Sequence, residues 1–332
     1  PHPLKVQTRV RFRKDGELLP YISIPAAYRE SIISRIKILA NLNIAERRVP
    51  QDGRIKFNVG GRQIDVRVSV IPMLFGEGVV MRLLDKANVL FTLPQLGMDQ
   101  ETYGRFRGLI ERPHGIVLVT GPTGSGKTTT LYASLNEIVG PTLKVLTVED
   151  PVEYHLQGVN QIPVDHKVGM TFEAGLRAIL RHDPDVVMIG EIRDFETARA
   201  AIQASLTGHL VLSTLHTNDA PSTVLRLVDL GVETFLLTAT IEAIVAQRLV
   251  RRVCTKCKEF FTPTEEQLME LALRPGDVEG RRFARGRGCD NCLKSGYKGR
   301  MALFEIMTLD DTIRELIMAQ ANTSVLRNEC RK

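Results

Sequence analysis

The sequence predicts an α/β protein in which a small α+β domain precedes a larger α/β domain. From about residue 99, short and continuously apolar stretches alternate with helical periodicity, which is typical of a parallel sheet covered by helices. From residue 6 to 85, apolar and polar residues alternate in short runs broken by glycine turns, which indicates antiparallel strands. A polar stretch at 254–299 contains two C-x-x-C pairs, which predicts a metal-binding subdomain within the larger domain.

The composition is that of a globular protein with room for two domains. The chain has 332 residues, of which 43% are hydrophobic and 25% charged, and its net charge is +6. No apolar run approaches the roughly 18 residues of a membrane-spanning helix, and no signal segment opens the chain. Lysine and arginine are spread out, aromatic residues make up 5% and tryptophan is absent, which argues against a specific nucleic-acid partner. Because the chain begins at Pro1 without an initiator methionine, we expect it to be a fragment of a longer protein.

Residues 1–90 are predicted to form the α+β domain. Most of this stretch has the two-residue period of strands, but residues 26–41 carry apolar positions at helical spacing. Residues 91–98, which contain Pro94 and Gly97, are predicted to link the two domains. The predicted strands are 6–12, 54–59, 63–70 and 78–84.

Residues 99–332 are predicted to form the α/β domain, with the metal-binding subdomain at 250–300. Its strands are short and apolar on both faces, as expected for strands inside a parallel sheet. The final segment, 303–332, is predicted to be helical and ends without a capping signal. The predicted strands are 116–120, 145–148, 185–189 and 210–214.

A glycine-rich loop follows the first of these strands. Residues 121–128 match G-x-x-x-x-G-K-[ST] at every required position, between a strand and a helix. In such a loop the backbone N–H groups and the helix N-terminus bind phosphate. Lys127 is expected to reach the β- and γ-phosphates and the Thr128 hydroxyl to help hold Mg²⁺. The predicted nucleotide-binding residues here are Gly121, Pro122, Thr123, Gly124, Ser125, Gly126, Lys127, Thr128 and Thr129.

Two clusters of carboxylates follow later strands, at 149–153 and 191–194. Residues that leave the carboxyl ends of parallel strands converge on the phosphate loop. Nucleotide hydrolysis needs one acidic group to order the metal and another to position the attacking water. We assign Glu191 to Mg²⁺ and Glu149 to the water, and the sequence leaves the opposite assignment open. Gly190-Glu191 stands where the usual second P-loop motif ends its strand in aspartate. The alternative for the acids of both clusters is that they are helix caps or solvated turn residues.

Two histidines bracket the predicted strand at 210–214. A histidine beside a strand is often structural, with its ring bound to a backbone carbonyl. Because both lie in line with the phosphate loop, we predict that His209 contributes to nucleotide binding. We predict that His216 senses the γ-phosphate or relays its presence to a neighbouring subunit.

Four of the five cysteines form two C-x-x-C pairs, Cys254 with Cys257 and Cys289 with Cys292. Four thiolates complete the tetrahedral shell of a structural Zn²⁺ and leave no open position for chemistry. Redox pairs or disulfides are the alternative, which the expected reducing compartment disfavours. Cys330 lies apart and is predicted to be a free thiol.

Taken together, these motifs resemble those of the type II secretion and type IV pilus assembly ATPases, a branch of the RecA-like motors. Four segments are similar to that family's nucleotide-site motifs and occur in its order: 121–128, 148–153, 185–194 and 208–218. Three more are similar to the family's amino-terminal half: 48–54, 65–69 and 76–85. The resemblance therefore covers nearly the whole chain.

The resemblance implies a homohexameric ring that hydrolyses ATP to drive pilin or pseudopilin assembly, cytoplasmic and peripheral at the inner membrane. It implies a RecA-like P-loop ATPase domain preceded by a PAS-like domain, with each nucleotide between the two. Arg67 and Arg82 match positions where the family places arginines that contact phosphate, for which the planar guanidinium is suited. Spacing alone would make both outward-facing strand arginines. The implied partner is an inner-membrane platform protein, reached through regions outside this chain.

Several alternatives stay open. A pilus retraction or DNA-uptake motor would have a similar core, but the family resemblance associates the four-cysteine element with assembly and secretion. Between those two, the sequence at 81–86 and 112–115 leans towards secretion. A nucleic-acid-binding zinc protein is the alternative from another class, suggested by the positive net charge and the cysteine pairs. Whether Arg67 and Arg82 act within the chain or on a neighbour is also undecided.

Overall fold

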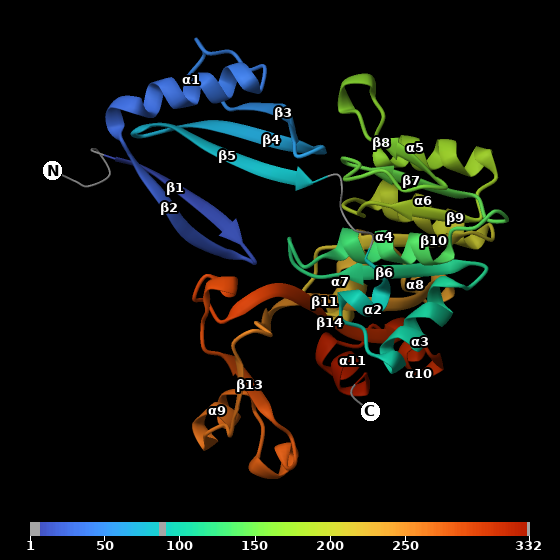
Figure 1. The fold of residues 1–332 in the computed structure, drawn as a ribbon. Helices are drawn as coiled ribbons and strands as arrows, with labels where there is room; N and C mark the ends of the chain where they lie inside the picture. The colour runs from blue at the N-terminus through green and yellow to red at the C-terminus, as the bar shows by residue number, and fades with distance from the viewer. Residues whose placement is uncertain (1–6, 86–90, 331–332) are drawn as a thin grey trace. The chain divides into compact units, whose positions relative to one another are not determined.

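The computed structural model describes residues 7–85 and 91–330 of the chain. The chain forms two compact units, Pro1–Val89 and Leu90–Lys332, whose elements are labelled in Figure 1. Within the described residues, no helix has both the length and the apolar character needed to cross a membrane.

The first unit combines a hairpin, a three-stranded antiparallel sheet and one helix. The hairpin pairs β1 (Gln7–Lys14) with β2 (Glu17–Pro25). The sheet has the order β3 (Gln51–Val59), β4 (Arg62–Met73), β5 (Gly76–Asp85). Between them, a 3-10 turn (Ala26–Tyr28) leads into α1 (Arg29–Leu39). The apolar face of the sheet forms a small core with the end of α1, made by Ala40, Ile55, Val66, Val68 and Val70.

The structure of this unit extends the sequence prediction. The predicted strands at 54–59, 63–70 and 78–84 lie within β3, β4 and β5. The strand β2 was not predicted, because it contains Pro20 and ends at Pro25, and proline is tolerated only at sheet edges or bulges. A two-stranded hairpin consists only of edges, and its register shifts between Val10 and Arg11, beside Pro20. Val6, the first residue of the predicted first strand, lies outside the described residues.

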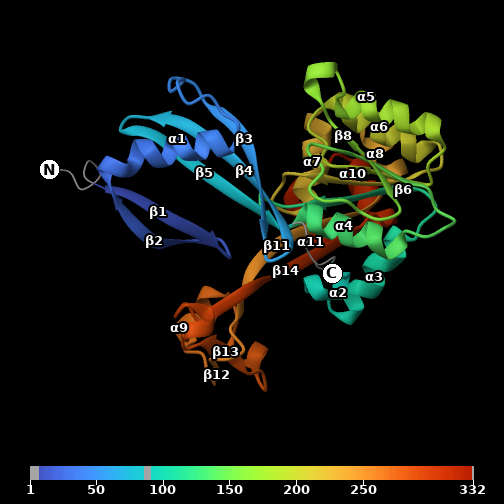
Figure 2. The ribbon, with the colours of Figure 1, turned by 45° about the horizontal axis from the view of Figure 1, so that its top comes forward.

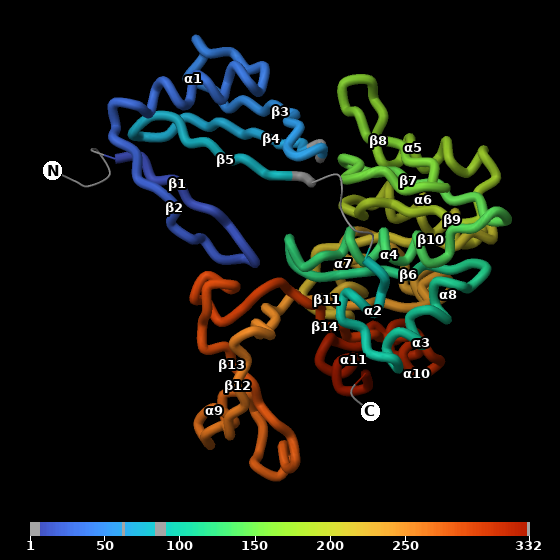
Figure 3. Tube along the Cα trace, in the orientation of Figure 1, coloured from blue at the N-terminus to red at the C-terminus, as the bar shows by residue number. Residues whose placement is uncertain are grey.

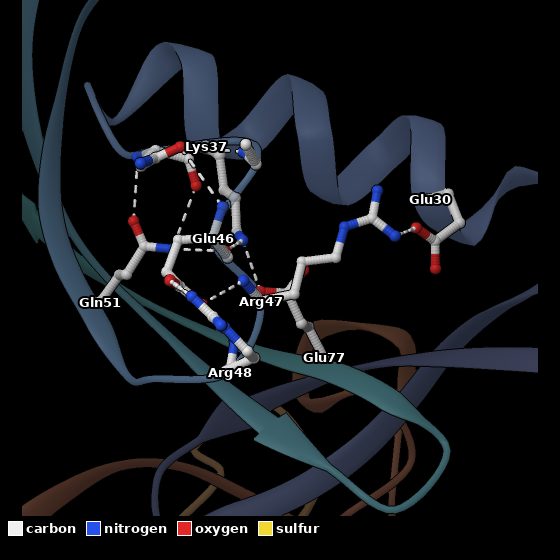
Figure 4. Close-up of polar contacts among 9 residues, drawn as sticks. Glu30, Lys37, Glu46, Arg47, Arg48, Gln51 and Glu77 are labelled. Atoms are coloured by element: carbon white, nitrogen blue, oxygen red, sulfur yellow. Dashed lines mark hydrogen bonds and ion pairs between the residues drawn. The ribbon is translucent and has the colours of Figure 1, made fainter.

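A buried lysine connects α1 to the sheet (Figure 4). Lys37 is 1% exposed, and its Nζ lies 2.5 Å from Oε1 of Glu77 on β5. The same ammonium donates a hydrogen bond to the backbone carbonyl of Glu46 at 2.7 Å, and the Gln51 amide donates to that carbonyl at 2.9 Å. Burying a charge is costly unless it is paired and hydrogen-bonded, and Lys37 is both. The helix, the sheet and the loop before β3 are thereby fixed together.

The second unit is built on a seven-stranded sheet that is parallel except at one edge. Its order is β14 (Tyr297–Thr308), β11 (Ile241–Val253), β6 (Gly115–Thr120), β10 (Leu210–Leu215), β9 (Val186–Ile189), β7 (Val145–Glu149), β8 (Val159–Pro163). Only β14 runs antiparallel to its neighbour, β11. The α/β class and the mostly parallel sheet predicted from the sequence are confirmed.

Helices cover both faces of this sheet (Figure 2). One core lies under α2 (Leu93–Leu96), α3 (Gln100–Ile110) and α4 (Lys127–Ile138). The other lies under α5 (Phe172–Ile179), α6 (Phe195–Leu206), α7 (Ala220–Asp229), α8 (Thr234–Thr240), α10 (Asp311–Met318) and α11 (Thr323–Glu329). Residues 91–98, predicted to be a linker, instead belong to this unit, because Leu93 and Met98 are buried in its first core.

The prediction of a helical segment at 303–332 is wrong for its first six residues. They complete β14, in which Leu303 and Glu305 are exposed while Phe304 and Ile306 are partly buried, the two-residue period of a strand. The helices α10 and α11 follow, each with a side-chain N-cap, from Asp310 and Asn322. Residues 331–332 lie outside the described part of the chain.

The chain leaves the sheet at the end of β11 and returns to it at the start of β14 (Figure 3). Between these strands it forms a small excursion with β12 (Lys258–Phe261) paired to β13 (Phe283–Gly286) and the helix α9 (Glu265–Glu270). The four paired cysteines all lie in this excursion, between the end of β11 and the start of β14.

Candidate nucleotide-binding site

The phosphate loop lies between β6 and α4, at the carboxyl edge of the parallel strands. Gly121 has φ +148°, and a Cβ atom there would come within 2.4 Å of the Gln247 carbonyl on β11. Gly126, the N-cap of α4, has φ +90°, a conformation that favours glycine. The loop therefore needs glycine at both positions, for backbone reasons that the motif anticipates. The remaining predicted residues, Pro122 to Thr129, follow along this loop and the first turn of α4.

Lys127 is the first residue of α4 and is 7% exposed. Its Nζ donates to the backbone carbonyls of Gly121 at 2.8 Å and Pro122 at 3.3 Å, and lies 3.3 Å from Nδ1 of His216. Burial lowers the pKa of Lys127, while the nearby charge of Glu191 opposes the shift. The ammonium is held in the loop by acceptors, in a position to turn towards an anion there.

His216 connects this lysine to an acidic residue from a neighbouring strand. Its Nε2 lies 3.1 Å from Oε2 of Glu191, which follows β9, and Arg193 Nη2 lies 2.5 Å from the other carboxylate oxygen. An ammonium only donates, so Nδ1 of His216 accepts from Lys127 and Nε2–H donates to Glu191. Burial raises the pKa of Glu191, but the hydrogen bond and charge of Arg193, with the hydrogen bond from His216, outweigh it and lower the pKa from its ordinary value. The structure therefore joins Lys127, His216 and Glu191 in one site.

Glu149, the predicted water-positioning residue, lies in the core. It is 2% exposed and accepts hydrogen bonds from the hydroxyls of Thr147 and Tyr132 and from the amide of Gln161. With its oxygens occupied by buried donors, the carboxylate is not available to a water molecule in the site. This geometry does not suit the catalytic role that we predicted, which was based on its place at a strand end alone. Glu153, four residues further on, is only half-buried.

His209 does not join the other site residues. It precedes β10, whose first residue pairs with Gly115 at the start of β6 and whose last pairs with Thr120 at the phosphate-loop end. Six residues of strand span about 17 Å, so the ring lies at the opposite edge of the sheet. Its Nδ1 contacts the Ala204 carbonyl at 2.8 Å. The structure thus does not support the prediction that His209 binds nucleotide, and the structural alternative describes it better.

Arg67 and Arg82 belong to the first unit. They are directly opposite each other on β4 and β5, and Arg54 on β3 is opposite Arg67. Directly opposed residues project from the same face of a sheet, here the face turned away from the core of Ile55 and Val66. This register fits the outward-facing strand arginines that spacing alone predicts, and contact of Arg67 and Arg82 with phosphate stays a prediction.

The four cysteines form one cluster whose sulfur atoms all lie within 4.8 Å of one another. The Sγ atoms are 3.9 Å apart for Cys254 and Cys289, 3.8 Å for Cys257 and Cys292, and 3.7 Å for Cys289 and Cys292. Sulfurs bound tetrahedrally at about 2.3 Å from zinc are about 3.8 Å apart, so the cluster fits that ion. Backbone N–H groups of Cys289 and Gly296 donate to Cys292 and lower the pKa of its thiol to about 6.

Several residues near the site were missed at the sequence level. Tyr132, Gln161 and Arg193 contact the two predicted acids, and Gln247 accepts from Thr130 behind the phosphate loop. Arg193 stands two residues from Glu191, so the motif itself offered a signal. The others come from separate strands and helices, and only the fold brings them together.

A parallel sheet that carries a G-x-x-x-x-G-K-T loop between strand and helix defines a P-loop nucleotide-binding protein. More narrowly, the chain belongs to the type II/IV secretion system protein family, whose model matches residues 2–332. This confirms the resemblance drawn from the motifs.

Curated relatives are similar over nearly all of this chain. The type IV pilus assembly ATPase PilB of Myxococcus xanthus is 49% identical over 98% of this chain and 58% of its own length. The type II secretion system protein E of Pseudomonas aeruginosa is 51% identical over 97% of this chain and 64% of its own length. The chain thus spans about three fifths of these relatives.

Solved structures have a similar fold. The Legionella pneumophila ATPase DotB has a TM-score of 0.65 at 22% identity, covering 98% of this chain and 84% of DotB. The pilus retraction motor PilT with bound ADP has a TM-score of 0.62 at 26% identity, covering 98% of this chain and 86% of PilT.

Proposed function

We propose that this chain is the ATP-hydrolysing core of a motor that assembles pseudopilins in type II secretion or pilins in type IV pilus biogenesis. The observation that carries the proposal is the connected group of Lys127, His216 and Glu191 at the phosphate loop. It is the arrangement that phosphoryl transfer needs, with a cation for the phosphates and an acid for the metal. The relatives named as pilus assembly and secretion proteins support the cellular role.

In this proposal the backbone N–H groups of residues 123–129, which follow Gly121 and Pro122 in the loop, bind the phosphates of ATP. Lys127 leaves the carbonyls that now hold it and neutralises charge on the β- and γ-phosphates. The Thr128 hydroxyl and Glu191 would hold Mg²⁺, which would supply Lewis acidity at the phosphates. Glu191 stays ionised because Arg193 and His216 outweigh its burial. As Lys127 turns away, His216 would turn its Nε2–H from Glu191 to the γ-phosphate and so sense it.

The attacking water would be positioned by Glu153 rather than Glu149. Glu149 is enclosed by three donors, whereas Glu153 follows the same strand end and is half-buried. We therefore assign the acceptance of a proton from the attacking water to Glu153.

The domain assignment and assembly follow from the same proposal. Residues 1–90 form the PAS-like half and residues 99–332 the RecA-like ATPase domain of a homohexamer, with Arg67 and Arg82 binding the terminal phosphates. The motor is cytoplasmic and contacts an inner-membrane platform protein through regions outside this chain.

Residues 250–300 form a zinc subdomain in this proposal. Cys254, Cys257, Cys289 and Cys292 hold one Zn²⁺, which contributes folding free energy and no chemistry. The distances of 3.7 to 3.9 Å between sulfurs support this role. The element favours assembly or secretion over pilus retraction, and the sequence leans towards secretion.

Phosphate release from ATP by Lys127→Ala tests the proposed activity. We expect hydrolysis to be abolished with an unchanged circular dichroism melt, because charge on the phosphates is no longer neutralised. Lys144→Ala is the matched control, since Lys144 directly precedes β7 at the opposite edge of the sheet. Near-normal hydrolysis by folded Lys127→Ala would refute the assignment.

A further inference from the structure

A buried polar cluster beside the phosphate loop has no role in the chemistry described so far. Tyr132 on α4 is 0% exposed, and its hydroxyl donates to Oε2 of Glu149 at the end of β7. The other oxygen of Glu149 accepts from the Thr147 hydroxyl at 2.6 Å and from the Gln161 amide at 3.0 Å. Three elements of the second unit, α4, β7 and β8, meet at this carboxylate.

This is an unusual way to bury an acid. In the described part of the chain no lysine or arginine contacts Glu149, so neutral donors alone offset the loss of its hydration. A buried carboxylate is costly even when hydrogen-bonded, and an apolar core would pack the same space at no such cost. The cluster therefore contributes directional contacts that an apolar side chain would not supply.

Those contacts hold the acidic segment that follows β7. The Tyr132 hydroxyl oxygen accepts from the backbone N–H of Glu153 at 3.2 Å. The Gln161 side chain donates to the Tyr154 carbonyl at 3.1 Å and accepts from the Leu156 N–H at 2.8 Å. Tyr132 is also five residues from Lys127, about 7.5 Å along the same helix. One side chain thus connects the helix that carries the phosphate lysine to the backbone of Glu153.

We propose that Tyr132 is a positioning residue for hydrolysis, and that Glu149 acts through it. A phenol has one proton, and giving it to Glu149 leaves the oxygen lone pairs facing the N–H of Glu153. Burial, with the hydrogen bond and charge of Glu149, raises the pKa of Tyr132, so the phenol keeps that proton. Glu149 sets the direction of the hydroxyl, and the hydroxyl sets the place of the Glu153 backbone. The inference rests on the proposed function, in which Glu153 positions the water.

Tyr132→Phe tests this directly, because it removes the hydroxyl and leaves the ring packed edge-on against Tyr154 at 4.6 Å. We expect kcat for ATP hydrolysis to fall about 10- to 100-fold, since small misplacements of a reacting group cost this much, while KM changes less than about twofold. Tyr154→Phe is the matched control, because within the described residues its hydroxyl makes no hydrogen bond. It should keep the kcat of the unaltered protein.

Amide exchange gives a second measurement that does not depend on turnover. In Tyr132→Phe the amide of Glu153 should exchange faster, while amides in the strand β6 keep their protection. A uniform rise in exchange, or equal changes in kcat and KM, would indicate general loosening and overturn the proposal.

Glu149→Gln separates positioning from chemistry, and if Tyr132→Phe does not fold, a fall in kcat of Glu149→Gln with little change in KM carries the test alone. If Glu149 acts through Tyr132, this variant loses about as much kcat as Tyr132→Phe, and the double variant is no slower than the slower single one. If the loss of kcat in the double variant is the product of the two single losses, the residues act independently and Glu149 does not act through Tyr132. An unaltered chain that does not hydrolyse ATP would defeat the proposed function itself. An active chain whose Tyr132→Phe variant matches it in kcat and KM would defeat only this inference.

Discussion

Replacing the buried Lys37 with methionine should destabilise the first unit by about 3–5 kcal/mol, the usual cost of breaking a buried ion pair. Methionine keeps most of the length of the side chain but removes the ammonium 2.5 Å from Glu77, whose side chain is 9% exposed. The Glu46 carbonyl keeps a donor, since Gln51 also binds it at 2.9 Å. Nearly all of the lost stability therefore comes from the buried Glu77 carboxylate, which no longer has its partner.

The free energy of opening should be read locally, because the chain has two units and no tryptophan to report on either. Amide exchange of the strand β4, followed by mass spectrometry, measures it for the first unit. A loss of 4 kcal/mol corresponds to exchange about a thousandfold faster, at 1.36 kcal/mol per tenfold change.

Two further variants decide whether the reasoning holds. Arg47→Gln breaks an exposed ion pair with Glu30 in the same region and should cost less than about 1 kcal/mol. Combining Lys37→Met with Glu77→Leu should recover most of the loss, because an apolar pair replaces the ionic one. If Lys37→Met costs no more than Arg47→Gln, the buried pair does not stabilise this unit as we describe.

Three predictions concern the second unit. Glu191→Gln should bind ATP but not hydrolyse it, and normal phosphate release would show that the acid is misassigned. Burial raises the pKa of Glu191 and the charge of Arg193 lowers it. Arg193→Gln removes the lowering charge, so the acid limb of kcat should move to higher pH, and an unmoved pH profile would contradict this. Elemental analysis should find about one zinc per chain, and Cys254→Ser should lose it and lower the melting temperature, while Cys330→Ser should do neither. A folded chain without metal would overturn the zinc site.

The parts of the fold that local patterns determine could be predicted from the sequence. The phosphate loop depends on glycine conformations and one lysine within eight residues, all visible in the motif. The four-cysteine cluster depends on two short ligand spacings. Strands such as β6 and β10 are fully buried and therefore read as continuous apolar runs. In each case the physical cause is near in sequence to its effect.

Features that depend on distant neighbours were not predicted. The strand β11 is buried in its first half and carries exposed arginines in its second, so it has no single pattern over its length. The burial of Glu149 depends on Tyr132 and Gln161, which lie 17 and 12 residues away. The first two follow from sheet order rather than from local sequence. His209 is different, because it precedes a parallel strand and its place at the edge away from the phosphate loop could have been inferred from chain order.

The pairing of β11 with β14 has a consequence for how the chain tolerates change. These strands are antiparallel neighbours, paired from Ala243 opposite Thr308 to Arg251 opposite Arg300, and after a register shift Val253 is opposite Tyr297. Everything between Val253 and Tyr297 therefore leaves and re-enters at two adjacent points. We expect that the whole cysteine-bearing excursion can be replaced there by a two-residue Asn-Gly hairpin turn while the strands of the sheet keep their positions. The seven-stranded sheet would then fold independently of the excursion.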